Sequence, residues 1–387
     1  MIRRCGALAL AALLFVALAL IAAPRADASA AGFHAEFSSE PASLDAGAPA
    51  ELRFVVRDSA GRAVRFLQFV HERPVHLLVV SRDLSDFAHI HPELGVDDAY
   101  HVNHSFAHGG GYRLFADYTP PGSGTIVDHF DVKVGGAQRP PTTLAPDAQL
   151  VHTVEGVTVT LSFDRALRAN EDQLLVATLV DSASASPVTD LQLYLGALAH
   201  FIIVSADLKE FIHAHPLETG EVFDPAQGTG TAHIHDPALL AKVLVGPSPS
   251  TIRAATSFPR AGRYKLWMQF QREGRVTTVP FVFEVAAALR VTASPRSTVP
   301  AAAIPINVSA GGYTPARIEL RKGVPAVLAL SRPQAGNCGG TVLIPGLKLR
   351  RDLPVGSTVL VRFTPTETAE IPFTCGMGMM QGLIVVK

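Results

Sequence analysis

The sequence predicts an all-β protein built from successive sandwiches. Short runs rich in β-branched and aromatic residues follow one another at close intervals, with turns between them. A hydrophobic content of 48% accompanies 28 prolines and 31 glycines, a composition that favours buried sheets with many turns over helical bundles. Beyond the first thirty residues, no long segment with a 3.6-residue period competes with this reading.

The N-terminus is typical of a secretory signal peptide. Arg3 and Arg4 precede an apolar run over residues 7–23, and small residues with A-x-A spacing follow around Ala28. We therefore assign residues 1–30 to a signal peptide and expect a periplasmic or secreted protein. No later run reaches the ~18 apolar residues that a membrane span needs, so we expect no span after the signal is removed.

The overall charge excludes some classes of partner. The formal net charge is −1, the pI is near 7.0, and the chain has no basic run. A nucleic-acid partner or an anionic-lipid surface is therefore not expected.

Two segments of the chain look like copies of each other. The pattern D-L-x-x-F-x-H-x-H-P occurs at residues 83–92 and again at 207–216. Each matched position is offset by 124 residues (200 − 76 and 213 − 89). A long motif at constant offset indicates a duplicated domain. We place the copies at residues 31–135 and 151–286. A linker rich in Pro, Thr and Gly separates them, and another rich in Ala, Pro and Ser follows the second copy.

The likeness continues beyond this motif, and it includes the strands. Tyr112 and Tyr264 begin matching β runs, now at an offset of 152, so the second copy contains 28 additional residues (152 − 124). We expect this insertion, roughly residues 219–249, to be an irregular loop with one short helix near 237–243. The strands expected in the two copies have the short, turn-separated pattern of immunoglobulin-like sandwiches. They cover residues 51–57, 76–81, 112–118, 130–134, 157–163, 174–180, 264–270 and 281–285.

Each copy carries three histidines that the predicted strands bring together. In the H-x-H segment the two imidazoles project from one face of a strand, about 7 Å apart. A third histidine begins the preceding strand, which is expected to pair with the H-x-H strand across the Asp-Leu turn. The two sets are His76, His89 and His91, and His200, His213 and His215.

The histidine sets have two interpretations. Imidazole suits Cu(II) and Zn, so each set is a candidate metal site. Alternatively, the histidines are hydrogen-bonded framework residues, with Asp83 and Asp207 capping the turns. His71 lies outside the motif and is expected at the surface. The ten-residue unit resembles repeats of exported bacterial proteins that often accompany metal-handling domains, a resemblance that implies no activity.

The C-terminal segment concentrates soft ligands. All fifteen histidines precede residue 287, whereas three of the five methionines fall within 377–380, directly after Cys375. Thiolates and thioethers select Cu(I) over hard cations. The segment therefore predicts a soft-metal site on a loop that leads into the last strand.

Residues 304–387 contain G-Y-x-P at 312–315, K-G-x-P at 322–325 and C-x4-M-x-G at 375–382, with Cys338 before a strand expected at 341–344. With these motifs the segment resembles the cupredoxin-like domain of periplasmic iron-uptake and copper-handling proteins. This resemblance implies a Greek-key β-sandwich with one ligand on an upstream loop and the others on the last loop. The residues implied at these ligand positions are Cys338, Cys375, Met380 and either Met377 or Met379.

The ligand types set the expected function. Since the domain has no histidine, a blue electron-transfer centre is disfavoured, and Cu(I) held by thiolates and thioethers is the leading interpretation. We expect an exported copper-binding protein for storage, delivery or resistance, with the metal ion and possibly another periplasmic metal-handling protein as partners. The main alternative is a structural or interaction protein of three sandwiches, stapled by a Cys338–Cys375 disulfide. No catalytic motif is present, so no enzyme activity is expected.

Overall fold

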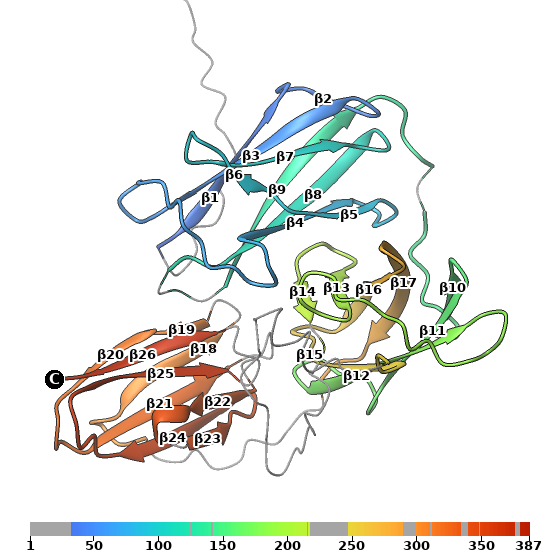
Figure 1. Cartoon of the computed structure of the whole chain (residues 1–387). Coiled ribbons are helices and arrows are strands. Elements are labelled where there is room, and N and C mark those ends of the chain that lie inside the picture. Colours follow the sequence, from blue (N-terminus) through green and yellow to red (C-terminus); the bar gives the residue numbers. More distant parts are fainter. Residues whose placement is uncertain are drawn as a thin grey trace, which may run out of the picture.

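The computed structural model describes residues 32–121, 123, 125–140, 142–214, 216, 247–288, 299–309, 312–333, 340–347, 349–375 and 380–387. Its strands form three sandwiches that succeed one another along the chain (Figure 1). The predicted all-β fold class is therefore confirmed. Within the described ranges the only helical element is the 3-10 turn Pro345–Leu347, and none of their helices is long and apolar enough to cross a membrane.

The first sandwich contains strands β1 to β9. One sheet has the order β1-β3-β7-β6 and the other the order β2-β9-β8-β4-β5. Between them lies a core that includes Leu52, Phe54, Leu77 and Leu114. The strands are β1 His34–Glu40, β2 Leu44–Asp45, β3 Pro49–Arg57, β4 Val75–Ser81, β5 Phe87–Ile90, β6 Glu93–Leu94, β7 Tyr100–Ser105, β8 Gly110–Tyr118 and β9 Ile126–Gly135.

The second sandwich contains strands β10 to β17. Its sheets have the orders β10-β11-β12-β15 and β14-β13-β16-β17. The second of these matches the β5-β4-β8-β9 part of the first sandwich strand by strand. The strands are β10 Val151–Val154, β11 Val157–Phe163, β12 Asp172–Asp181, β13 His200–Ser205, β14 Phe211–Ala214, β15 Thr251–Ser257, β16 Gly262–Arg272 and β17 Arg275–Val285. The helix expected near 237–243 lies outside the described residues.

The third sandwich contains strands β18 to β26. Its sheets have the orders β19-β18-β21-β24 and β20-β26-β25-β22-β23. The strands are β18 Ile304–Ser309, β19 Gly312–Thr314, β20 Arg317–Leu320, β21 Ala326–Arg332, β22 Thr341–Ile344, β23 Leu349–Asp352, β24 Ser357–Phe363, β25 Ala369–Cys375 and β26 Gln381–Val386.

Strands β4 and β13 differ from the others in being buried on both faces. In β11 the apolar Val157, Val159 and Leu161 alternate with more exposed polar residues, as a half-buried strand requires. Every residue of β4 and of β13 is buried instead. One face of each strand meets its own core, and the other face meets the neighbouring sandwich.

A separate apolar cluster joins the first two sandwiches. Each sandwich contributes one strand, its following turn and one aromatic residue. The members are Leu78, Val80, Leu84 and Phe115 from the first sandwich, and Ile202, Val204, Leu208 and Trp267 from the second. Two stacked ring pairs flank this cluster, and each pair joins a ring of one sandwich to a ring of the other. Phe87 stacks on Trp267 at 4.5 Å, and Phe211 stacks on Phe115 at 5.3 Å. Equivalent residues thus make equivalent contacts in both directions.

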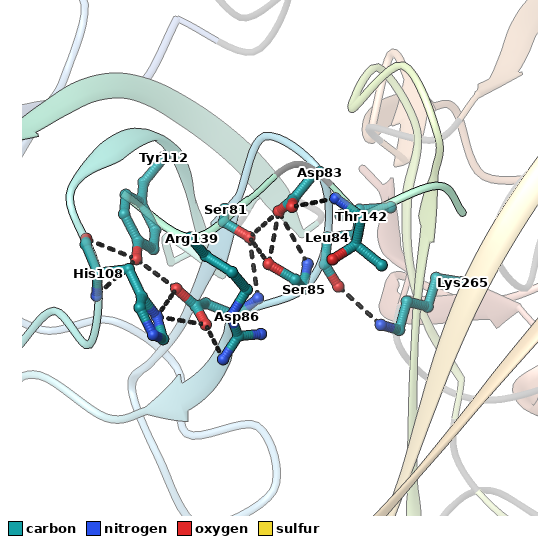
Figure 2. A network of polar contacts seen from close by, with 10 residues as sticks. All are labelled: Ser81, Asp83, Leu84, Ser85, Asp86, His108, Tyr112, Arg139, Thr142 and Lys265. Carbon is teal, nitrogen blue, oxygen red and sulfur yellow. Dashed lines mark hydrogen bonds and ion pairs between the residues drawn. The ribbon is translucent and has the colours of Figure 1, made fainter. Parts of the chain in front are cut away.

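The Asp-Leu turn of each copy docks onto the other sandwich. Asp83 accepts hydrogen bonds from the Ser81 and Ser85 hydroxyls, both 2.7 Å long (Figure 2). Burial raises the pKa of Asp83, but these hydrogen bonds outweigh it and lower the pKa to about 2. The turn holds Leu84 at a φ of 58°, and the Leu84 carbonyl accepts a hydrogen bond from Lys265 Nζ at 2.7 Å. On the opposite side, Arg113 Nη1 donates to the Leu208 carbonyl at 2.8 Å.

Candidate metal centre

A cluster of buried and half-buried histidines lies where the β4–β5 edge of the first sandwich meets the β13–β14 edge of the second. Ring centroids of the contacting pairs are between 4.7 and 6.3 Å apart. We call this set the histidine cluster. Its described members are His71, His76, His89 and His91 from the first sandwich, and His200 and His213 from the second.

The local fold brings the first three imidazoles together as the sequence predicts. Strand β4 carries His76 and pairs antiparallel with β5, which carries His89; His91 follows one residue after β5. One ring nitrogen of each of these three residues lies within 4.8 Å of the other two. The centroids of the three rings are 4.7 to 5.3 Å apart.

The outer hydrogen bonds of His76 and His89 determine what their inner nitrogens can do. His76 Nε2 donates to the Val70 carbonyl at 2.8 Å, and His89 Nδ1 donates to Gln269 Oε1 at 2.8 Å. Gln269 is held in turn by its Nε2 donating to Thr278 Oγ1 at 3.1 Å. A neutral imidazole has a single N–H, so His76 Nδ1 and His89 Nε2, 3.1 Å apart, both present lone pairs. Two facing lone pairs repel unless a cation lies between them.

The third imidazole has a buried ring nitrogen without a hydrogen-bond partner in the part of the chain that the structure describes. His91 Nε2 is buried and has no hydrogen-bond partner among the described residues. Leaving a buried polar nitrogen unpaired costs about 1–3 kcal/mol. A bound ion would satisfy this nitrogen together with the two that face each other.

The second sandwich repeats this arrangement. His200 Nε2 donates to the Tyr194 carbonyl at 2.8 Å, and His200 Nδ1 lies 3.3 Å from His213 Nε2. His213 Nδ1 lies 3.4 Å from Asp117 Oδ2 of the first sandwich. In each copy, the first histidine of the H-x-H segment thus contacts a side chain of the other sandwich. His89 contacts Gln269, and His213 contacts Asp117.

Burial keeps these imidazoles in the neutral form that binds metals. It lowers the pKa of His76, His200 and His213 well below the usual value, and neighbouring imidazoles lower the pKa further. Burial also lowers the pKa of His89 to about 4 and strongly lowers that of His91. Since metals coordinate neutral imidazole, no proton has to be displaced at neutral pH.

Burial also affects the carboxyl group beside the second pair. It raises the pKa of Asp117 to about 7, with the neighbouring His89 opposing the shift. This is a perturbed carboxyl group held against a histidine, a combination that is frequent at functional sites.

The third sandwich presents a different picture from the expected thiolate site. Cys375 is disulfide-bonded, and its partner lies outside the described residues. A disulfide sulfur has no thiolate to offer, so in this oxidised form Cys375 is not the expected Cu(I) ligand. Met380 is 1% exposed and packs in the core with Cys375, its backbone N–H 3.3 Å from Cys375 Sγ. Cys338, Met377 and Met379 lie outside the described residues.

Two further expectations about histidines meet different outcomes. His71, expected at the surface, is only 9% exposed and contacts the histidine cluster, because the turn that carries it is covered by the second sandwich. His215 lies outside the described residues. Both aspartates of the framework interpretation do cap their turns, since Asp83 and Asp207 accept hydrogen bonds from Ser81 and Ser205.

Sequence reasoning missed Gln269, Asp117 and the union of the two histidine sets. One signal was present: Asp117 and Gln269 occupy matching positions at the 152-residue offset, next to Phe115 and Trp267. Their relation to the histidines depends on how the two sandwiches pack, which no spacing within one copy reveals.

Comparison with known families defines the chain as an all-β protein with two related N-terminal segments and a cupredoxin-like C-terminal domain. The family described as Domain of unknown function (DUF8832) matches residues 28–136 and 152–287, more than half of the sequence. The chain therefore belongs to that family. Residues 282–386 match the Cupredoxin-like domain family. Among curated proteins, none matches this chain.

Several solved structures are similar to parts of the chain. The Cu(I)-bound metal-binding domain of the Cu(I)-exporting ATPase CopA from Streptococcus pneumoniae is 31% identical over 24% of this chain and 93% of its own, with a TM-score of 0.22. A copper binding protein in the apo form is 37% identical over 22% of this chain and 85% of its own, with a TM-score of 0.21. The Escherichia coli adhesin FdeC is 13% identical over 66% and 64%, with a TM-score of 0.21.

Proposed function

We propose that this protein is an exported, non-enzymatic copper-binding protein whose principal site is the histidine cluster. The observation that carries the proposal is the pair His76 Nδ1 and His89 Nε2, which face each other at 3.1 Å while their other nitrogens are engaged with carbonyl oxygens. Nitrogens bound about 2.0–2.1 Å from one ion can be this far apart. The C-terminal cupredoxin-like match supports a copper-related role.

The chemistry of the cluster favours particular ions. Imidazole nitrogens suit Cu(II) and Zn(II), and among divalent ions Cu(II) binds such ligands most tightly. Among the residues that the structure describes, no thiolate or carboxylate oxygen lies close enough to His76, His89 and His91 to join them as a ligand. We infer a periplasmic or secreted role in copper storage, delivery or resistance, with the metal ion as the ligand.

A titration of the intact, non-reduced protein with Cu(II) in the presence of a competing chelator tests this proposal. We expect tight binding that falls at least tenfold in His76→Ala and in His91→Ala. His34→Ala is the matched control, because His34 lies at the start of β1 and belongs to no part of the cluster. Equal affinity in all four proteins would contradict the proposal.

The third sandwich is a second candidate site, for Cu(I). Cys375 and Met380 are in contact. Both lie in the segment that matches the cupredoxin-like domain, at positions where we expected metal ligands. Because Cys375 is disulfide-bonded, Cu(I) binding by Cys338, Cys375, Met377 and Met380, with Met379 as substitute, requires prior reduction. We expect Cu(I) uptake by this domain only after a thiol reductant has been added; uptake that needs no reduction, or none after it, would exclude the site.

A further inference from the structure

We propose that the histidine cluster is a two-ion centre, in which His200, His213 and His71 bind a second metal ion beside the one held by His76, His89 and His91. This inference rests on the proposed function. It adds a second site, to which the first sandwich contributes His71, and a chemical difference between the two sites.

The first support is the repetition of the same hydrogen-bond pattern at the second pair. His76 and His200, 124 residues apart, each donate from Nε2 to a carbonyl six residues upstream, of Val70 and Tyr194, at 2.8 Å. Each then presents Nδ1 to Nε2 of the matching H-x-H histidine, at 3.1 Å in one copy and 3.3 Å in the other. The carbonyl contact of the first histidine and the close approach of Nδ1 to Nε2 are therefore repeated at the second pair.

The second support is the position of His71. A tight turn in each copy is closed by a bridge between Val70 and Arg73, or between Tyr194 and Ala197. At the matching position within these turns stand His71, with a φ of 49°, and Leu195, with a φ of 51°. The two turns have the same shape, and only the first copy places an imidazole in it.

His71 is directed toward the histidines of the other sandwich. Its ring centroid lies 5.5 Å from that of His200, with the planes at 89°, and 6.2 Å from that of His213. The centroids of His200 and His213 are 5.5 Å apart. These distances exceed the 4.7 to 5.3 Å of the first set. Among the described residues only His76, His89 and His91 bring their ring nitrogens within 4.8 Å of one another, so binding at the second set requires His71 to move toward His200 and His213.

The residues behind the two sites make them chemically different. His89 is oriented by the neutral Gln269, whereas His213 is oriented by the carboxyl group of Asp117. A carboxylate behind a metal-bound histidine raises its basicity, and loss of such a partner typically costs 10–100-fold in metal affinity. The two sites are also close, since the centroids of His76 and His213 are 5.2 Å apart. Two Cu(II) ions bound there are expected to couple magnetically.

The test combines metal content with electron paramagnetic resonance on the intact, non-reduced protein loaded with Cu(II). We expect two equivalents of copper and a signal whose intensity is well below that of two isolated ions. His71→Leu, which copies the residue of the second sandwich, should retain one equivalent with a full isolated signal. Asp117→Asn, a nearly isosteric change, should weaken only one equivalent, by 10–100-fold.

The outcomes separate this inference from the proposed function. One equivalent that is lost in His91→Ala and unaffected by His71→Leu and Asp117→Asn would overturn the second site and leave the first intact. No copper bound to the wild type would overturn both. Circular dichroism of each metal-free variant verifies folding, and if His71→Leu fails to fold, Asp117→Asn decides the question.

Discussion

His89 of the first sandwich donates a hydrogen bond of 2.8 Å to Gln269 of the second sandwich, 180 residues further along the chain. This contact fixes the tautomer of His89 and directs its Nε2 toward His76 Nδ1. The contact between His89 and Gln269 therefore both joins the two sandwiches and orients a nitrogen of the histidine cluster for metal binding.

Changing Gln269 should alter metal affinity without removing a ligand. In Gln269→Ala, His89 loses the acceptor that orients it, and we expect Cu(II) affinity to fall 10–100-fold. Gln269→Glu keeps an acceptor and adds a charge behind the histidine, so affinity should be restored or increased. Competition titrations of both variants measure this. Equal weakening in the Ala and Glu variants would show that Gln269 contributes only to packing.

Trp267 provides both a probe and a test of the interface. It is the only tryptophan of the chain, is 3% exposed and stacks on Phe87 at 4.5 Å. Because Gln269 lies two residues away on β16, paramagnetic Cu(II) bound at the cluster should quench the Trp267 fluorescence strongly, whereas Zn(II) should not.

Removing the indole should separate the sandwiches. Trp267→Ala is expected to lower the free energy of unfolding by about 3–5 kcal/mol and to weaken metal binding along with it. Trp267→Phe retains a stacking ring and serves as the control in both measurements. An unchanged metal affinity in Trp267→Ala would contradict the dependence of the site on this interface.

The metal-free protein should lose stability below neutral pH. The folded state holds the pKa of His89 near 4, below its ordinary value of 6.5, so between these values the unfolded chain binds more protons. Stability from His89 is therefore present above pH 6.5 and is lost as the pH falls toward 4, on the order of 3 kcal/mol. The pKa values of His76, His91, His200 and His213 are shifted in the same direction.

One neighbouring group acts in the opposite sense. Because the pKa of Asp117 is raised to about 7, its protonated form stabilises the folded state below that pH and this contribution is lost as the pH rises. A single carboxyl group opposes five imidazoles, so the net expectation is a lower unfolding free energy at pH 5 than at pH 7.5. Denaturant titrations of chelator-treated protein provide the measurement, and equal or greater stability at pH 5 would refute it.

The disulfide of Cys375 should stabilise the third sandwich and leave the histidine cluster untouched. Cys375→Ser removes the cross-link, and loss of a native disulfide typically costs about 2–5 kcal/mol. We expect a lower melting temperature for the third sandwich with unchanged Cu(II) affinity in the absence of reductant. A parallel loss of Cu(II) binding would place the principal site at the third sandwich instead.

Much of the fold could be predicted from the sequence, because short runs of β-branched and aromatic residues between turns indicate strands. The expected strand at 157–163 coincides with β11, and the one at 341–344 with β22. The pairing of the His76 strand with the H-x-H strand is also as predicted. Each of these depends on short-range patterns of apolar and turn residues.

The composition of the site could be predicted only in part. His76, His89 and His91 meet because a hairpin brings them together, which spacing reveals. The contributions of His71 and Gln269 depend on contacts between sandwiches, and such contacts leave no period in the sequence. The soft-metal interpretation of Cys375 rested on ligand type, and ligand type does not specify the oxidation state of a sulfur. Cys375 is buried and disulfide-bonded.

The most direct test of the central claim is X-ray absorption spectroscopy of the intact, non-reduced protein loaded with one equivalent of Cu(II). Binding at the histidine cluster predicts nitrogen neighbours at about 2.0 Å, with the multiple scattering of imidazole rings and no sulfur. A sulfur neighbour at about 2.3 Å would place the metal on cysteine or methionine and contradict the account.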